Sequence, residues 1–224
     1  MIKYLVERIM LSSLRKAYRR ICWVGPIPDF NKNQPIVLYA NHTTFHDGYV
    51  LWLVSKTLFN REVHLWMEEW DAFPLFGAVG ARPFPRDDAR QRMRTMRSTA
   101  QFLASSPNST LIYFPEGELH PPEMGILPFP EDTMQRLAKI LPDAYWWPVG
   151  IHLTTRGEAQ PTLILTAGEP HAKPDGKERD RLKECVDLLR NDVLECETVL
   201  LGGKQSPNET WDFRFLRPFF KRYL

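Results

Sequence analysis

Apolar residues follow two patterns along the chain, and the two patterns alternate. Short runs that are almost wholly apolar predict buried strands, and longer runs with apolar residues every three or four positions predict helices. The predicted strands are 36–40, 63–67, 110–114, 145–151 and 162–166. The predicted helices are 2–21, 48–59, 87–104, 131–140 and 177–200. Strands that alternate with helices predict an α/β domain with a largely parallel central sheet flanked by helices.

Composition and cysteine content narrow the class of protein. A chain of 224 residues with 43% hydrophobic and 25% charged residues suits one folded domain. Its net charge of +2 does not support a nucleic-acid partner. Three cysteines without a C-x-x-C pair predict a reducing compartment and no disulfide framework. Cys185 and Cys196, eleven positions apart, are expected to share one buried face of the helix at 177–200.

Charge is concentrated at the two ends of the chain. Residues 1–24 contain six basic residues and one acidic residue, and residues 211–224 contain four and one. The helix at 2–21 has one apolar side and a basic remainder, a pattern typical of a helix lying in an anionic membrane interface. The same pattern also fits a helix that packs on its own domain and exposes the basic face. Alternating aromatic and basic residues in 211–224 favour the membrane interpretation.

These features predict three parts and a peripheral location. They are an amphipathic basic membrane-associating helix at 1–24, an α/β domain at 25–205 and a basic-aromatic tail at 206–224. No run of eighteen uninterrupted apolar residues predicts a spanning helix, and no N-terminal segment has the pattern of a signal peptide. We therefore expect the protein at the cytoplasmic face of a membrane, bound peripherally.

The first candidate for chemistry follows the strand predicted at 36–40. His42 and Asp47 lie between that strand and the next helix, where open α/β sheets usually bind ligands. A His there can take a proton from a substrate hydroxyl, and the Asp can hold the imidazole and stabilise its charged form. The alternative is purely structural: the His caps the helix, and the Asp interacts with the dipole in its first turn.

Two further polar segments follow predicted strands. Prolines fix Arg82 and Arg86 in an extended segment, where they suit a phosphate or carboxylate or else simply face solvent. Glu116 stands between Pro115 and Gly117 after the strand at 110–114, in a tight turn. Its carboxylate can hydrogen-bond a substrate hydroxyl, or it can face water.

The order of these segments resembles a known family. The motifs are N-H-x4-D at 41–47, G-x-x-x-F-x-R at 80–86, F-P-E-G at 114–117 and W-P-V-G-I at 147–151. Together they resemble the four blocks of the glycerophospholipid acyltransferases, which include the lysophosphatidic acid acyltransferases. The resemblance covers roughly residues 35–155.

The resemblance implies transfer of a fatty acyl group from a thioester, on coenzyme A or acyl carrier protein, to a lipid hydroxyl. In such an enzyme His42 is the general base, Asp47 is its partner, Glu116 binds the acceptor and Arg86 binds its phosphate. The other residues expected in substrate binding are Asn41, Arg82 and Gly117. The chain lacks a G-x-S-x-G motif, so no acyl-enzyme is expected. We expect neither a metal nor a cofactor besides the acyl-CoA or acyl carrier protein donor.

The chain also departs from the family pattern. Many members continue F-P-E-G with T-R-S, whereas this chain has Glu118 and Leu119 in the first two of these positions. Downstream, Glu131 and Asp132 stand where members often have basic residues. Added negative charge disfavours a phosphorylated acceptor, so an unphosphorylated, sugar-bearing or zwitterionic lipid alcohol is the alternative. A thioesterase-like hydrolase and a non-catalytic lipid-binding protein are the remaining alternatives.

Overall fold

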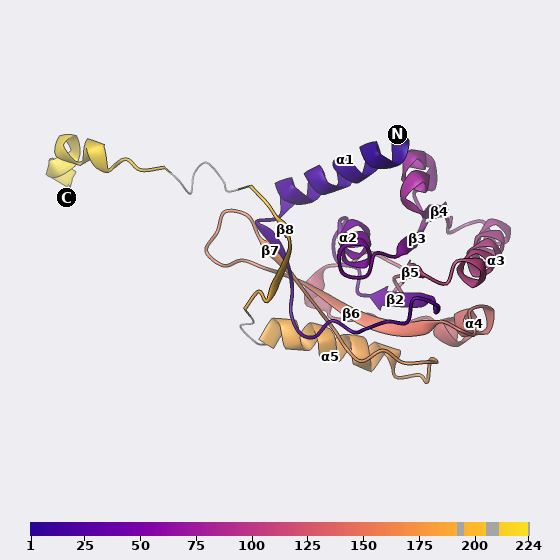
Figure 1. The fold of residues 1–224 in the computed structure, drawn as a ribbon. Coiled ribbons are helices and arrows are strands. Elements are labelled where there is room, and N and C mark those ends of the chain that lie inside the picture. The colour runs from indigo at the N-terminus through magenta and orange to yellow at the C-terminus, as the bar shows by residue number, and fades with distance from the viewer. Residues whose placement is uncertain (192–194, 205–210, 224) are drawn as a thin grey trace.

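One mixed sheet of eight strands organises the chain, in the order β4-β3-β5-β2-β6-β7-β1-β8 (Figure 1). The computed structural model describes residues 1–191, 195–204 and 211–223. The strands are β1 (Arg20–Trp23), β2 (Ile36–Ala40), β3 (Glu62–Met67), β4 (Ala81–Pro83), β5 (Ser109–Tyr113), β6 (Tyr145–Thr154), β7 (Thr162–Ala167) and β8 (Thr198–Gly202). The pairs from β4 across to β6 are all parallel, as is β7 with β1, and β6–β7 and β1–β8 are antiparallel. The predicted α/β class with a largely parallel sheet is confirmed.

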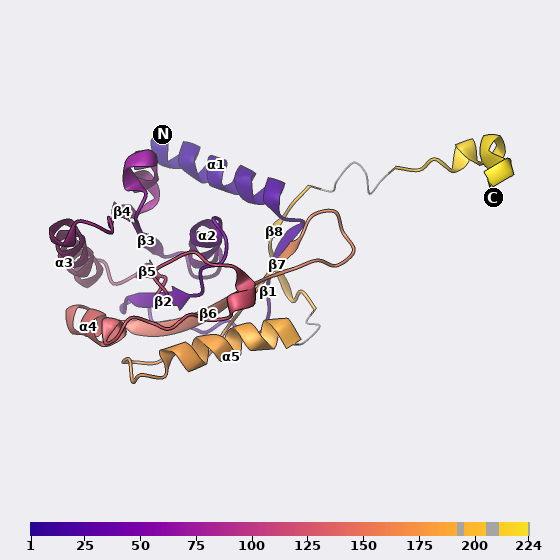
Figure 2. The ribbon, with the colours of Figure 1, turned by 180° about the vertical axis from the view of Figure 1, so that it is seen from behind.

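Helices cover both faces of this sheet (Figures 1 and 2). The α-helices are α1 (Ile2–Ala17), α2 (Asp47–Phe59), α3 (Ala89–Ser105), α4 (Thr133–Ile140) and α5 (Glu178–Asn191). Short 3-10 helices are η1 (Trp70–Ala72), η2 (Pro74–Val79), η3 (Pro122–Met124) and η5 (Arg214–Tyr223). Helices α1 and α2 lie on one face, and α4 and α5 lie on the other together with α3, which is near the β4 edge.

Strand β2 lies at the centre and is buried along its whole length. Its residues alternate between the two hydrophobic cores, as successive strand residues must. Ile36, Leu38 and Ala40 face the core under α1 and α2, and Val37 and Tyr39 face the core under α3, α4 and α5. Burial on both faces explains why the sequence shows a continuous apolar run here.

The apolar face of helix α1 extends beyond the residues that pack against the core. Val6, Met10 and Leu14, each four residues apart, are buried against the domain. Ile2, Leu5 and Ile9 are about half exposed on the same helix. The two interpretations of this helix are therefore compatible, because one strip packs on the domain and another faces outward. The helix ends at Ala17, four residues earlier than predicted, and 20–23 form strand β1 inside the sheet.

The predicted helix at 177–200 is wrong at its C-terminal end, over residues 195–200. Helix α5 ends at Asn191, and Thr198–Gly202 form β8, an edge strand antiparallel to β1. The run Thr198-Val199-Leu200-Leu201 suits a strand as well as a helix, and pairing with β1 decides between them. Residues 192–194, inside the predicted helix, lie outside the described residues. Strands β1, β4 and β8 were not predicted from the sequence.

The cysteine prediction is wrong as well. Cys196 does not share a helix face with Cys185 but forms a disulfide with Cys22 of β1, 174 positions away in the sequence. Cys185 is the free thiol, buried on α5. The pairing depends on β8 returning beside β1, which spacing along the chain cannot reveal. The expectation of a reducing compartment loses its basis with this disulfide.

The remaining predictions about the ends of the chain concern the tail and membrane spans. The aromatic side chains of Trp211, Phe213, Phe215 and Phe219 are exposed, and 205–210, at the predicted tail boundary, lie outside the described residues. Among the described residues, no helix has both the length and the apolar content to cross a membrane.

Candidate active site

The loop from β2 into α2 builds its structure around the Asp47 carboxylate. Asp47 is the first residue of α2 and is wholly buried. Its Oδ2 accepts hydrogen bonds from the backbone N–H groups of Thr43 at 2.7 Å and Thr44 at 2.8 Å. Its Oδ1 accepts one from the Thr44 hydroxyl at 2.6 Å. These donors and the helix N-terminus hold a negative charge in one orientation.

His42 completes a pair with this carboxylate. Its Nδ1 lies 3.1 Å from Asp47 Oδ2. Its ring stacks on Phe114, with centroids 4.1 Å apart and planes at 16°. The side chain is 25% exposed, and no group in the described part of the chain hydrogen-bonds its Nε2. The geometry leaves Nε2 as the nitrogen that can exchange a proton with a bound molecule, which is the arrangement a general base needs.

Glu116 acts on the backbone of the same residue. It follows β5, and its Oε2 accepts the His42 backbone N–H at 2.8 Å. Its Oε1 accepts the Leu127 N–H at 2.8 Å and lies 2.9 Å from Nε2 of His120. The side chains of Glu116 and His120 are 0% and 3% exposed. The structure therefore places Glu116 behind His42, with its carboxylate enclosed by protein donors.

Two predicted substrate-binding residues shape the backbone around the site. The Asn41 amide is buried and exchanges two hydrogen bonds with the backbone of Ile151, at 2.9 and 2.8 Å. This ties the end of β2 to β6. Gly117 has φ +75°, a conformation that favours glycine, and its N–H donates to Phe114 O at 3.2 Å. Both residues fix the turns that carry His42 and Glu116.

The two arginines lie at a different place along the same sheet edge. Arg82 is exposed on β4, opposite Trp66 of β3. Strands β3 and β5 separate β4 from β2, which at about 4.8 Å per strand gives about 14 Å across the sheet. Arg86 is exposed and paired with Glu68, with Nε 3.1 Å from Oε1. The structure thus brings Asn41, His42, Asp47, Glu116 and Gly117 together and leaves both arginines to one side.

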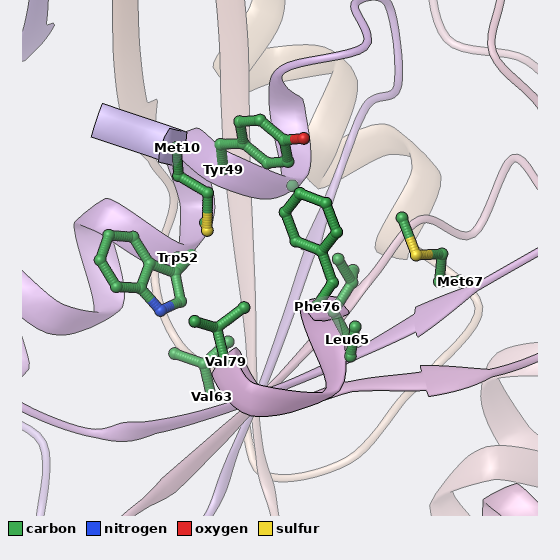
Figure 3. Close-up of a pocket in the computed structure, with 10 residues that line it drawn as sticks. Met10, Tyr49, Trp52, Val63, Leu65, Met67, Phe76 and Val79 are labelled. Carbon is green, nitrogen blue, oxygen red and sulfur yellow. The ribbon is translucent and has the colours of Figure 1, made fainter. Parts of the chain in front are cut away.

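A small apolar cavity begins next to Asp47, since Gly48 lines it (Figure 3). Its volume is about 20 Å³, which is room for about one water molecule. Met10 of α1, Tyr49 and Trp52 of α2, and Phe76 of η2 contribute to its lining. An acyl chain does not fit in this volume unless the lining side chains move.

Among the described residues no three His, Cys, Asp or Glu side chains gather as a metal site.

Several residues of this site were not anticipated from the sequence. Thr44 and Phe114 belong to the recognised motifs, but their contacts with Asp47 and His42 depend on the folded loop. Ser13 lies in α1 and Tyr18 directly follows it. The Tyr18 and Ser13 hydroxyls approach the His46 ring at 3.3 and 2.9 Å. A polar residue in an apolar helix stripe was the available signal for Tyr18. No sequence signal pointed to Ser13.

Comparison with known proteins gives the class of the chain. Residues 24–152, more than half of the chain, match the family model described as Acyltransferase. The chain belongs to the acyltransferase family and is an acyltransferase, as the four sequence blocks indicated. The crystal structure of the 1-acyl-sn-glycerophosphate (LPA) acyltransferase PlsC from Thermotoga maritima is similar, with TM-score 0.58 and 18% identity over 86% of this chain and 83% of that chain. This likeness confirms the fold. No curated protein sequence matches the chain.

Proposed function

We propose that this acyltransferase moves a fatty acyl group from a thioester, on coenzyme A or acyl carrier protein, to the hydroxyl of a lysophospholipid-like acceptor. The observation that carries the proposal is the buried Asp47 carboxylate bonded to Nδ1 of His42, with the opposite ring nitrogen left available. PlsC, which shares the fold, is a 1-acyl-sn-glycerophosphate acyltransferase, and 1-acyl-sn-glycerophosphate is a lipid. Lipid acyl transfer is the reaction class that fits both.

The reaction we infer has one displacement at the acyl carbon. Nε2 of His42 takes the proton of the acceptor hydroxyl while that oxygen attacks the thioester carbonyl carbon. The tetrahedral adduct then collapses, the carbon–sulfur bond breaks, and the leaving thiolate takes the proton from the imidazolium. Asp47 stabilises the imidazolium between the two proton transfers. Products are the acylated lipid and the free thiol, and atoms and charge balance without a further reactant.

The cysteines support direct transfer without an acyl-enzyme. Cys22 and Cys196 are joined in the disulfide, so neither offers a thiol. Cys185 is buried on α5, and burial raises the pKa of its thiol to about 11. A thiol with so high a pKa is scarcely ionised near neutral pH and is a poor nucleophile.

An acceptor without a phosphate is the second candidate, and one observation favours it. Glu68 already pairs with Arg86, and Glu118 is exposed beside the turn that carries Glu116. A phosphate at Arg86 must compete with the Glu68 carboxylate. An uncharged headgroup or a zwitterion faces no such competition.

The test is thiol release from a long-chain acyl-CoA, with lysophosphatidate and an unphosphorylated lipid alcohol offered separately. We expect acceptor-dependent release by the wild type and a loss of about 10²- to 10⁴-fold in His42→Ala, since the variant lacks its general base. Release of free fatty acid at a rate independent of any acceptor would identify a hydrolase instead. Unchanged release by His42→Ala would refute the mechanism.

We further propose that the enzyme docks on an anionic membrane through an apolar rim, defined as Ile2, Leu5, Ile9, Phe45, Phe73 and Leu75. All six side chains are exposed. Helix α1 packs against η2, and the rings of Phe45 and Phe73 lie 6.4 Å apart, so the rim is continuous. Phe45 is three residues from His42, which places the rim beside the site. Lys3 and Arg8 on α1 supply positive charge for anionic lipids.

Docking is best tested by substitutions at exposed positions of α1. Deletion of the whole helix would also remove its core residues and disturb the fold. We expect Leu5→Glu/Ile9→Glu to reduce binding to vesicles of phosphatidylcholine with phosphatidylserine by tenfold or more. Leu188→Glu, an exposed leucine of α5 on the other side of the sheet, is the control. Equal binding by the wild type, Leu5→Glu/Ile9→Glu and Leu188→Glu would eliminate the rim as the docking surface.

A further inference from the structure

A chain of polar side chains lies behind Asp47, on the side away from His42. The Thr44 hydroxyl contacts Asp47 Oδ1 at 2.6 Å, and the Tyr18 hydroxyl lies 3.4 Å from Thr44 Oγ1. Nδ1 of His46 is 3.3 Å from the Tyr18 oxygen, and Ser13 Oγ is 2.9 Å from His46 Nε2. Ser13 belongs to α1 and Tyr18 follows its last turn, so this series of side chains connects α1 to the loop between β2 and α2.

The direction of each hydrogen bond follows from counting protons. A carboxylate only accepts hydrogen bonds, so the Thr44 hydroxyl must donate its one proton to Asp47. The Tyr18 hydroxyl must then donate to Thr44, or that contact would hold no proton at all. Nδ1–H of His46 donates in turn to the Tyr18 oxygen, and Nε2 of a neutral ring accepts from Ser13. Every donor therefore points toward Asp47.

The protonation states of the two ring side chains agree with this direction. Burial lowers the pKa of His46, and the negative charge of Asp47 opposes that change more weakly. The ring is therefore neutral near pH 7 and carries a single N–H. Burial is also the main cause of a raised pKa for the Tyr18 phenol, which keeps its proton. Tyr18 is 4% exposed, so water does not compete with its partners.

We propose that Thr44, Tyr18 and His46 are positioning residues that hold the Asp47 carboxylate for His42. With Oδ1 occupied by Thr44, Asp47 directs Oδ2 at the imidazole. The assignment rests on the proposed acyl transfer with His42 as its base. Helix α1 thus contributes two surfaces, an outer one in the apolar rim and an inner one that reaches the catalytic pair.

The experiment compares Thr44→Val, which removes the hydroxyl at nearly constant volume, with Thr44→Ser, which keeps it. We expect Thr44→Val to lower kcat about tenfold at its pH plateau, because the carboxylate loses a donor and its fixed orientation. The acid limb of the kcat/KM profile should move to higher pH, because a carboxylate deprived of this donor attracts the protonated His42 more strongly. Thr44→Ser should restore both properties to near the wild-type values.

Tyr18→Phe should show the same changes at smaller size, since it acts through Thr44. Tyr4→Phe, which changes an exposed tyrosine of α1, is its matched control and should leave both readouts unchanged. Thermal unfolding of every variant separates these effects from loss of folded protein. An acid limb that stays in place in Thr44→Val, or equal behaviour of Thr44→Val and Thr44→Ser, would overturn the assignment. If the wild type itself releases no thiol, the proposed function fails instead.

Discussion

The segments that follow β2 and β4 lie at the same edge of the sheet but differ in construction. After β2, Asp47 is fully buried with donors at 2.6 to 3.1 Å on both oxygens. After β4, Arg86 is exposed and has one exposed acidic partner, Glu68. Buried hydrogen bonds to a charge are strong and fix geometry, whereas an exposed ion pair contributes little and rearranges easily.

The difference separates two requirements of an acyltransferase. Proton transfer needs the imidazole at one place in every turnover, so the β2 segment is held from several directions. Acceptor recognition tolerates small movements of the headgroup, so we expect exposed arginines to suffice. We therefore propose that the buried carboxylates near β2 set the chemistry and that the surface near β4 sets acceptor choice.

The strongest challenge to this division is Glu116→Gln. Glutamine has an NH₂ group in place of one carboxylate oxygen. This NH₂ group would face either the N–H of His42, or the N–H of Leu127 and the His120 ring, which the carboxylate oxygens contact in the wild type. We expect kcat to fall about 100-fold and the free energy of unfolding to fall by about 1–3 kcal/mol, because buried donors lose their acceptor. KM for the acceptor should change little, since the carboxylate is enclosed by protein.

The matched control is Glu118→Gln, because Glu118 is exposed two residues away. Steady-state kinetics with acceptor varied, together with thermal unfolding, check the prediction. A raised KM with kcat intact would mean that Glu116 binds the acceptor, as the family resemblance implied. It would also show that the buried region near β2 serves recognition, which removes the contrast.

A smaller effect is expected from the arginines, and it should depend on the acceptor. In Arg82→Ala/Arg86→Ala we expect KM for a phosphorylated acceptor to rise about tenfold with kcat unchanged, as for loss of a contact made equally in ground and transition states. KM for an unphosphorylated lipid alcohol should stay the same. Glu68→Gln frees Arg86 and should lower KM for the phosphorylated acceptor two- to threefold, consistent with an exposed ion pair of about 0.5 kcal/mol.

Steady-state kinetics on both acceptors, run side by side, decide the outcome. Equal effects of the double substitution on both acceptors would place the arginines outside phosphate recognition. A large fall in kcat would place them in the catalytic step, against the division proposed above.

The parts of the site found from sequence are those built within one loop. His42 and Asp47 are five positions apart, so their meeting required only the turn between β2 and α2. Glu116 was found as a turn residue, but its contact with the His42 backbone spans 74 positions and depends on β5 lying parallel beside β2. Its burial behind His42, instead of exposure to the acceptor, was therefore outside the reach of pattern analysis.

The missed features share the same physical origin. Tyr18 reaches Thr44 across 26 positions, and the Cys22–Cys196 disulfide closes across 174. In each case a helix or edge strand returns to a distant part of the chain, and side-chain pairing follows from that return. Local periodicity predicted most of the elements correctly but could not locate β8, because its apolar run fits both a helix and a strand.

The smallest predicted effect concerns His64 on β3, between the two regions. Burial, and then the charge of Arg82, lower the pKa of its ring to about 4. Unfolded His64 takes up a proton below about pH 6.5 and the folded ring does not, so stability is lost as pH falls through this range. Between pH 7 and 5.5 we expect the free energy of unfolding of the wild type to fall by about 1 kcal/mol more than that of His64→Leu.

Urea unfolding of wild type, His64→Leu and Arg82→Ala at both pH values measures this difference. His46, His152 and His171 also have lowered pKa values, and their shared contribution cancels in the comparison. Arg82→Ala should reduce the pH-dependent loss, because it removes the second cause of the shift. Equal losses in wild type and His64→Leu would contradict the buried neutral ring. A loss unaffected by Arg82→Ala would mean that the charge on β4 is screened by solvent, and the exposed region near β4 would then have no electrostatic effect on β3.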